Sequence, residues 1–410
     1  MTWLVVILGL VLLVFLHELG HFLVARAVGS RPRSFYIGFP PAVAKVEWRG
    51  VEYGIGAIPL GGYVRIPGMN RPAARDLELA MGPALREVPE LTPAVRLVGR
   101  ALERDDFPAA RAALPALREE VASATLSRSA ARAANRALRD VEEGTGPDAY
   151  WHQRTWKRIA IIAAGPLANV LVAFVIFFAV YATGAPSPNP STEVAAVEAN
   201  TPAAAAGLQP GDRVVAVNGV AATTFDAVSR DIRASRGGPV TLTVRRGGRT
   251  VTLGPRPTIR QGGHWIWGFQ PAAKLVSYPL GTSARWAAGD CWRVVSGTAG
   301  ALRSVFGSRH GSGQVTSVVG ITRYSVAALK VSFSWYLQIL GLVSMSLALL
   351  NLLPLLPLDG GHILFSVIEA VRRRALAREI YERVSVVGFA LILMIWVIAL
   401  SNDFSGSGPH

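Results

Sequence analysis

The sequence has a single cysteine, Cys291, which excludes an intrachain disulfide bond and a metal site built from several thiolates. We interpret Cys291 as a core or surface residue rather than a nucleophile. The chain is also poor in charge, because Asp, Glu, Lys and Arg make up only 17% of its 410 residues. Its mean hydropathy of +0.34 is unusual for a soluble enzyme and indicates a membrane protein.

The apolar residues are gathered into four long runs. A helix of about 20 apolar residues crosses a bilayer core of about 30 Å, and each run is near this length. We therefore expect a polytopic α-helical membrane protein with four transmembrane helices. The runs cover residues 3–27, 159–182, 333–358 and 380–400.

The first run could instead be a signal peptide cleaved near Ala25-Arg26-Ala27. Residues 1–3 supply no side-chain positive charge, however, and polar residues at 17–21 would interrupt its hydrophobic region. We therefore expect the first run to be retained as a transmembrane helix.

Basic residues outnumber acidic residues by 42 to 27, a net charge of +15. No basic patch is interleaved with aromatic residues as nucleic-acid binding would need, so we expect no nucleic-acid partner. Most of the basic residues near the runs fall on one side if the N-terminus is extracytoplasmic, as the positive-inside rule expects, with Arg323 and Lys330 as minor exceptions. They are Arg26, Arg31, Arg33, Arg154, Lys157, Arg158, Arg372, Arg373, Arg374 and Arg378.

The first run contains the sequence HELGH at residues 17–21. On a helix, His17 and His21 lie on one face, so both imidazoles can reach one metal ion, and Glu18 lies beside them as a general base. A pair of hydrogen-bonded core histidines is the structural alternative. Three ionisable residues within an apolar span are costly in lipid, which favours a functional zinc site.

Zinc in a catalytic site usually has three protein ligands. Asp359 is the only carboxylate near the end of the third run, which would run in the same direction as the first. His17 lies about 21 Å of helix beyond Trp3, in the same inner half of the membrane. We therefore expect Asp359 to be the third ligand, with His362 as a competing candidate. Pro354 and Pro357 should break the helix there.

Several segments together resemble the site-2 protease family, in its bacterial regulator of sigma-E protease branch. The resemblance rests on residues 17–21, 53–64, 165–169 and 351–361. It implies an intramembrane zinc endopeptidase in which His17, His21 and Asp359 bind zinc and Glu18 activates water. It also implies a substrate contact for Asn169, for which a hydrogen bond between helices is an equal alternative. Gly360, where backbone can approach closely, is a second candidate for contacting substrate.

The resemblance further implies a β-rich element that dips into the membrane from the cytosolic side. Alternating residues at 44–48 and 51–55 predict a β-hairpin with Arg49-Gly50 at its turn. An unpaired edge of this hairpin could hold an unwound substrate as an extended strand.

Residues 205–219 resemble a bacterial PDZ domain, with turn sequences at Pro210-Gly211-Asp212 and Asn218-Gly219 and a closing hairpin around Gly247-Gly248. We expect this domain to be extracytoplasmic and to bind a peptide or exclude large substrates, or to act as a spacer. Residues 68–150 are rich in Ala and Arg and predict two or three amphipathic helices on the cytosolic face. Tryptophans at 265–292 indicate an interfacial segment.

These interpretations give eight parts. They are helix 1 (1–30), the membrane-reentrant β element (31–67), the cytosolic helical insert (68–150), helix 2 (156–183), the PDZ domain (192–256), an extracytoplasmic linker with amphipathic segments (257–332), helix 3 (333–371) and helix 4 (378–401).

We expect a multi-pass protein of the bacterial inner membrane that cleaves single-span membrane proteins such as anti-sigma factors or remnant signal peptides. Its termini would be extracytoplasmic and its active site would lie in the cytosolic half of the bilayer. A membrane-tethered PDZ adaptor with a non-catalytic metal site is the main alternative, although it predicts loss of Glu18 or Asp359. A metal transporter would need further polar residues spaced along a span to form a path, which the fourth run does not offer.

Overall fold

The computed structural model describes residues 2–69, 71–187, 190–261, 263–272, 275–307, 318–376 and 378–404. The chain divides into two compact units, which are described separately. The first unit comprises Met1–Val175, Asp290–Lys330 and Ile339–His410, and the second comprises Ile176–Gly289 and Val331–Gln338.

Four helices among the described residues are long and apolar enough to cross a membrane, which confirms the number expected from the sequence. Apolar side chains such as Leu8 and Leu23 remain exposed on the first of them, as lipid contact requires. The four are α1 (Thr2–Ala27), α6 (Thr155–Thr183), α11 (Phe333–Asn351) and the Ile380–Ser401 part of α13 (Arg378–Phe404).

The third predicted helix, 333–371, is not continuous. Helix α11 ends at Asn351, and a separate helix, α12 (Asp359–Arg372), begins at Asp359. Pro354 and Pro357 explain the break, because proline has no N–H to donate and its ring clashes with the preceding turn. The break places Asp359 at the first turn of a new helix rather than within a long one.

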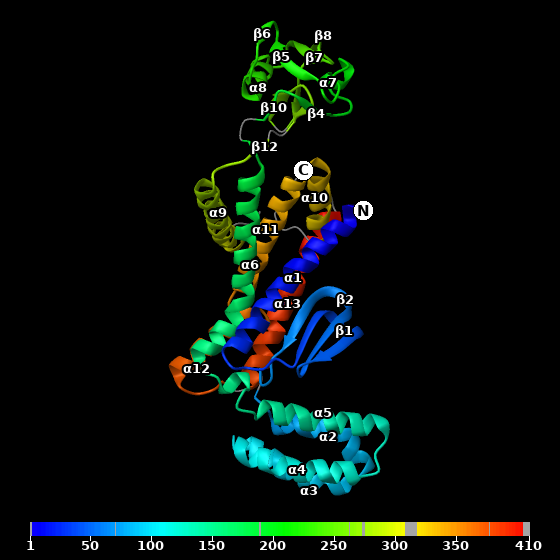
Figure 1. Cartoon of the computed structure of the whole chain (residues 1–410), viewed down its shortest axis with the longest axis vertical. Helices are drawn as coiled ribbons and strands as arrows, with labels where there is room; N and C mark the ends of the chain where they lie inside the picture. Colours follow the sequence, from blue (N-terminus) through cyan, green and yellow to red (C-terminus); the bar gives the residue numbers. More distant parts are fainter. Residues whose placement is uncertain are drawn as a thin grey trace. The chain divides into compact units, whose positions relative to one another are not determined.

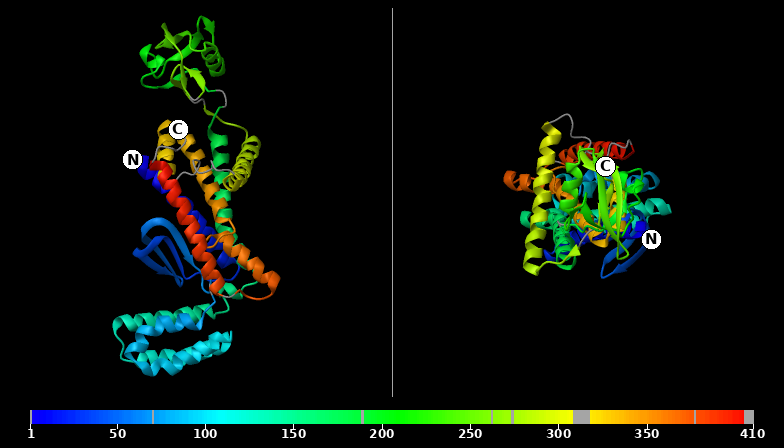
Figure 2. Two further views of the ribbon diagram at one scale, coloured as in Figure 1. Left: turned by 180° about the vertical axis from the view of Figure 1, so that it is seen from behind. Right: turned by 90° about the horizontal axis from the view of Figure 1, so that it is seen from above.

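The predicted β-hairpin is confirmed by strands β1 (Ser34–Trp48) and β2 (Val51–Arg65). Arg49 and Gly50 have φ values of 52° and 74°, as a two-residue turn matched to the strand twist requires. Both strands bend, so that Phe35 pairs with Tyr53 and also with Val64. Strand β2 packs against α1 (Figure 2).

The insert contains four α-helices, so the prediction of two or three was too low. Helices α2 and α5 pair in one layer and α3 and α4 in another (Figure 1). Side chains of Asp106 and Ser127 cap two of the helices by accepting from the backbone N–H of Ala109 and Ala130. The bounds are α2 (Ala74–Glu87), α3 (Thr92–Glu103), α4 (Phe107–Ser123) and α5 (Arg128–Gly144), with 3₁₀ turns η1 (Pro89–Leu91) and η2 (Tyr150–His152).

The second unit contains a four-stranded sheet in the order β6-β5-β7-β8. The turns predicted at Asn218-Gly219 and Gly247-Gly248 are confirmed, because all four residues have positive φ. The bounds are β3 (Ala185–Pro186), β4 (Val194–Val197), α7 (Pro202–Ala205), β5 (Arg213–Val217), β6 (Val220–Ala221), α8 (Phe225–Ala234), β7 (Pro239–Arg246) and β8 (Arg249–Pro257).

This fold continues beyond residue 256. Strand β11 (Phe269–Pro271) pairs with β4, and Trp267, only 1% exposed, lies in the same apolar core as Val214 and Leu242. Trp267 is therefore a core residue and not part of an interfacial segment. The remaining elements are β9 (Ile259–Gln261), β10 (His264–Ile266), β12 (Leu275–Val276), α9 (Leu280–Gly307) and α10 (Val318–Val331).

Candidate metal centre

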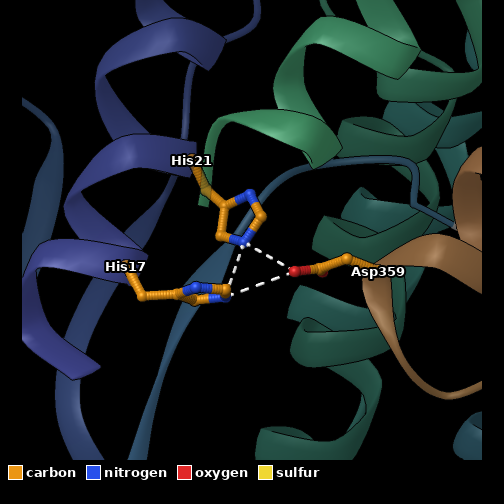
Figure 3. A group of neighbouring side chains, drawn as sticks. All are labelled: His17, His21 and Asp359. Carbon is orange, nitrogen blue, oxygen red and sulfur yellow. Dashed lines mark hydrogen bonds and ion pairs between the residues drawn. The ribbon is translucent and has the colours of Figure 1, made fainter. Parts of the chain in front are cut away.

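Three buried or half-buried side chains converge in the first unit, two from α1 and one from the start of α12 (Figure 3). His17 and His21, one helical turn apart, point their Nε2 atoms toward each other at 3.2 Å. The Oδ2 atom of Asp359 lies 3.2 Å from His17 Nε2 and 3.4 Å from His21 Nε2. The structure therefore brings together the three residues that the sequence predicted to share a metal ion.

The triangle formed by these three atoms fits zinc. Bonds of about 2.0–2.1 Å in a tetrahedral site hold ligand atoms about 3.3 Å apart, close to the observed edges. The Oδ2 atom of Asp359 is buried, and among the described residues it has no hydrogen-bond donor beyond the two histidine nitrogens, so its lone pairs are available to a metal ion. Two imidazoles and a carboxylate also form a donor set found in catalytic zinc sites.

The outer nitrogen of His21 is held by the backbone of α6. Its Nδ1 lies 2.8 Å from the carbonyl oxygen of Ile161, which can only accept a hydrogen bond. The proton of a neutral His21 therefore belongs on Nδ1, which leaves the Nε2 lone pair directed at His17 and Asp359. Gly165, one turn further along α6, leaves the space that the His21 ring occupies.

Asn169, predicted to contact substrate, is fully buried on α6, and its Nδ2 lies 3.2 Å from His17 Nδ1. The described contact is thus one between helices, and a substrate contact stays a prediction. Gly360 is also buried, and a Cβ atom there would collide with the carbonyl groups of Leu352 and Leu353. Close packing requires glycine at 360, and its predicted substrate contact is likewise untested.

Glu18 lies on α1 next to His17 and contacts the β-hairpin. The backbone of Val64 lies close to its carboxylate. A Cβ atom at Gly62 would lie only 3.0 Å from Glu18 Cγ, so this part of β2 passes directly over the proposed base. His362, the competing ligand, is outside the three-residue group found among the described residues.

Gly165 and Val64 are site residues that the sequence did not reveal. Both fall in segments that carry the family resemblance, residues 165–169 and 53–64. A glycine and a backbone group carry no chemical signature of their own, so only the packing of α6 and β2 against α1 reveals their roles.

A family model described as Peptidase family M50 matches residues 5–395, and the chain belongs to this family, the site-2 proteases. A protein of Mesorhizobium japonicum, provisionally named as a zinc metalloprotease, is 31% identical over 97% of this chain and 96% of its own. The zinc metalloprotease RasP of Geobacillus kaustophilus is 30% identical over 95% of this chain and 94% of its own. The metalloprotease MmpA of Caulobacter vibrioides is 29% identical over 95% of this chain and 92% of its own.

The class of protein follows from these matches. The chain is a zinc-dependent metalloprotease. The four apolar helices among its described residues, together with the family, identify it as a membrane protein.

Proposed function

We propose that this membrane zinc metalloprotease is an endopeptidase that cuts transmembrane segments of single-span membrane proteins. The main support is the position of the donor triangle, the three atoms His17 Nε2, His21 Nε2 and Asp359 Oδ2. His17 and His21 lie in the apolar helix Thr2–Ala27, within 3.4 Å of Asp359 Oδ2. Ionisable groups are costly within a membrane span. Cleavage of peptide bonds inside the bilayer is a function that requires ionisable groups at this position.

In this mechanism His17, His21 and Asp359 hold the metal and Glu18 moves the proton. Zinc, when bound, acts as a Lewis acid that acidifies water and stabilises negative charge on the substrate oxygen. Glu18 takes the proton of the attacking water and delivers it to the leaving amine. The backbone of strand β2 at Gly62 and Val64 lies against the Glu18 side chain and would hold its carboxylate in place for both steps.

The substrate helix has to be unwound before attack, because its own hydrogen bonds shield each peptide bond. Strand β2 runs over Glu18, so an extended substrate added to the edge of the β1–β2 sheet would lie beside the proposed base. This supports the hairpin as the element that receives the substrate as a strand.

The proposed orientation puts both termini outside the cytoplasm of a bacterial cell and the metal site in the cytosolic half of the inner membrane. The basic residues near the helix ends support it. In this orientation the domain built on β4–β8 is extracytoplasmic. We assign it as a PDZ domain that binds a peptide or restricts access, supported by the tight turns at Gly207 and Gly211, both with positive φ.

A membrane-tethered PDZ adaptor with a non-catalytic metal site is the second candidate. It offers no reason for Glu18 to lie beside the metal ligands and against the backbone of β2. The proposed test is to co-express the full chain with a panel of truncated single-span proteins. The wild type should cleave at least one member and Glu18→Gln should not. Equal cleavage by both would refute the proposed chemistry, and cleavage of none would favour the adaptor.

A further inference from the structure

Asn169 faces the outer nitrogen of a proposed zinc ligand. Its Nδ2 atom lies 3.2 Å from Nδ1 of His17, and the side chain is fully buried. Its other amide atom, Oδ1, is buried and has no hydrogen-bond partner within the described parts of the chain. A buried carbonyl oxygen without a donor is costly, so this amide orientation satisfies only one of its two ends.

The chemistry of a metal-bound imidazole requires the opposite amide orientation. If His17 Nε2 gives its lone pair to zinc, the proton of the neutral ring lies on Nδ1 and needs an acceptor. A half-turn of the amide about its last side-chain bond exchanges oxygen and nitrogen in nearly the same volume. We propose that Asn169 is a positioning residue whose Oδ1 accepts the His17 Nδ1 proton in the zinc-loaded enzyme. The proposal rests on the ligand set of the proposed function.

An asparagine at this position can serve both tautomers of His17. With Nδ2 toward the ring, it donates to an unprotonated Nδ1, while Nε2–H faces Asp359 Oδ2 at 3.2 Å. With Oδ1 toward the ring, it accepts from Nδ1–H and leaves Nε2 free for the metal. The backbone of Asn169 is fixed independently, because Ser344 Oγ donates to its carbonyl oxygen at 2.8 Å.

Two substitutions separate this role from a substrate contact. Asn169→Asp keeps an acceptor and loses the donor, whereas Asn169→Leu has a similar size and loses both. Loss of an outer partner of a metal-bound histidine costs about 10–100-fold in metal affinity. We therefore expect Asn169→Leu to bind zinc about 10–100-fold more weakly and Asn169→Asp to stay within about threefold of wild type.

The measurement is zinc affinity of the purified full chain in detergent, by competition with a chromogenic chelator, together with the visible absorption of the cobalt-substituted protein. Asn169→Leu should alter the cobalt spectrum, and Asn169→Asp should restore it. Leu171→Ala, which changes an exposed side chain of the same helix α6, is the control and should bind zinc like wild type.

Two results would overturn the proposal. One is wild-type zinc affinity and cobalt spectrum in Asn169→Leu, and the other is equal loss of zinc in Asn169→Asp and Asn169→Leu, which would mean that the amide acts as a donor. His17→Ala distinguishes an error in the proposed ligand set from an error in the role of Asn169. If it still binds zinc tightly, the proposed metal site is wrong; if it loses zinc while Asn169→Leu does not, only the positioning role is wrong.

Discussion

Gly165 of α6 lies against the imidazole of His21, so that a Cβ atom at position 165 would collide with Nε2. This is the nitrogen that faces His17 and Asp359. The absence of a side chain at one residue of α6 thus allows a ligand of α1 to reach its position. The two helices also approach closely at Gly20, where a Cβ atom would clash with the backbone of Ala164.

Gly165→Ala should displace the His21 ring and break its hydrogen bond to Ile161. We expect a loss of zinc affinity of about 10–100-fold, as for other changes that misplace a metal ligand. Chelator competition on the purified chain measures it. Gly289→Ala is the control, since a Cβ atom there meets nothing within 4 Å. Equal affinity in both variants would contradict the packing argument.

Glu18→Gln and Asp359→Asn should separate chemistry from metal binding. Glu18 is not one of the three converging donors, so Glu18→Gln should keep its zinc while cleavage of a single-span substrate falls at least about 100-fold. Asp359→Asn removes the anionic ligand and should lose both zinc and cleavage. Metal analysis after desalting and a gel-based cleavage assay give the two readouts. Retention of zinc by Asp359→Asn would rule out its role as ligand.

Arg246 and Asp212 should stabilise the domain of the second unit. Asp212 is 1% exposed and accepts from Arg246 Nε at 2.7 Å and Nη2 at 2.6 Å. Arg246→Gln leaves this carboxylate poorly paired and should lower the free energy of unfolding by about 1.5–3 kcal/mol. Urea-dependent proteolysis of the full chain within residues 192–256 measures the change. The exposed pair Arg213–Glu193 provides the control, because Arg213→Gln should cost less than about 1 kcal/mol.

The same pair predicts a pH dependence. The hydrogen bonds from Arg246 lower the pKa of Asp212 below its ordinary value. A lowered folded-state pKa contributes stability above the unfolded pKa of about 3.9 and loses it as the pH falls further. Wild type should therefore lose resistance to urea below about pH 4, and Arg246→Gln should lose less over that range. Parallel curves for the two proteins would contradict the linkage.

Leu117 and Leu79 should separate the core of the insert from its surface. Leu117 is fully buried in α4, whereas Leu79 in α2 is 68% exposed. Leu117→Ala should destabilise the four-helix insert by about 2–5 kcal/mol, and Leu79→Ala by less than about 0.5 kcal/mol. Limited proteolysis within residues 74–144 reports the difference. Zinc content should be unchanged in both, since the insert supplies no side chain to the donor triangle.

The metal ligands could be predicted because their positions follow from local helical spacing or from the number and direction of the membrane spans. His17 and His21 are fixed by helical spacing. Asp359 is reached by span direction and depth, although α11 ends before it. The contact of Asn169 with His17 could not be predicted, because it depends on how far α6 is rotated and shifted against α1. The sequence restricts Asn169 to the bundle and leaves its partner open.

The fold shows the same division. The turns at Arg49-Gly50 and Asn218-Gly219 were predictable because residues with positive φ carry a strong local preference. The residue type alone does not place Trp267, because tryptophan suits both a membrane surface and a core, and only the pairing of β11 with β4 distinguishes them. In the insert, Asp106 caps the start of α4, so the short polar segment after α3 separates two helices. The sequence does not distinguish this arrangement from one longer helix.

The separation of the ligands along the chain has a consequence for biosynthesis. Asp359 follows His17 by 342 residues (359 − 17), and α12 must be made before the third donor can join the first two. At a synthesis rate of about 5–20 residues per second, Asp359 is made roughly 17–70 s after the two histidines. We expect a nascent chain to be unable to complete the donor set during this interval. Proteolytic competence would then begin only after most of the polypeptide has left the ribosome, which protects neighbouring membrane proteins from a half-made enzyme.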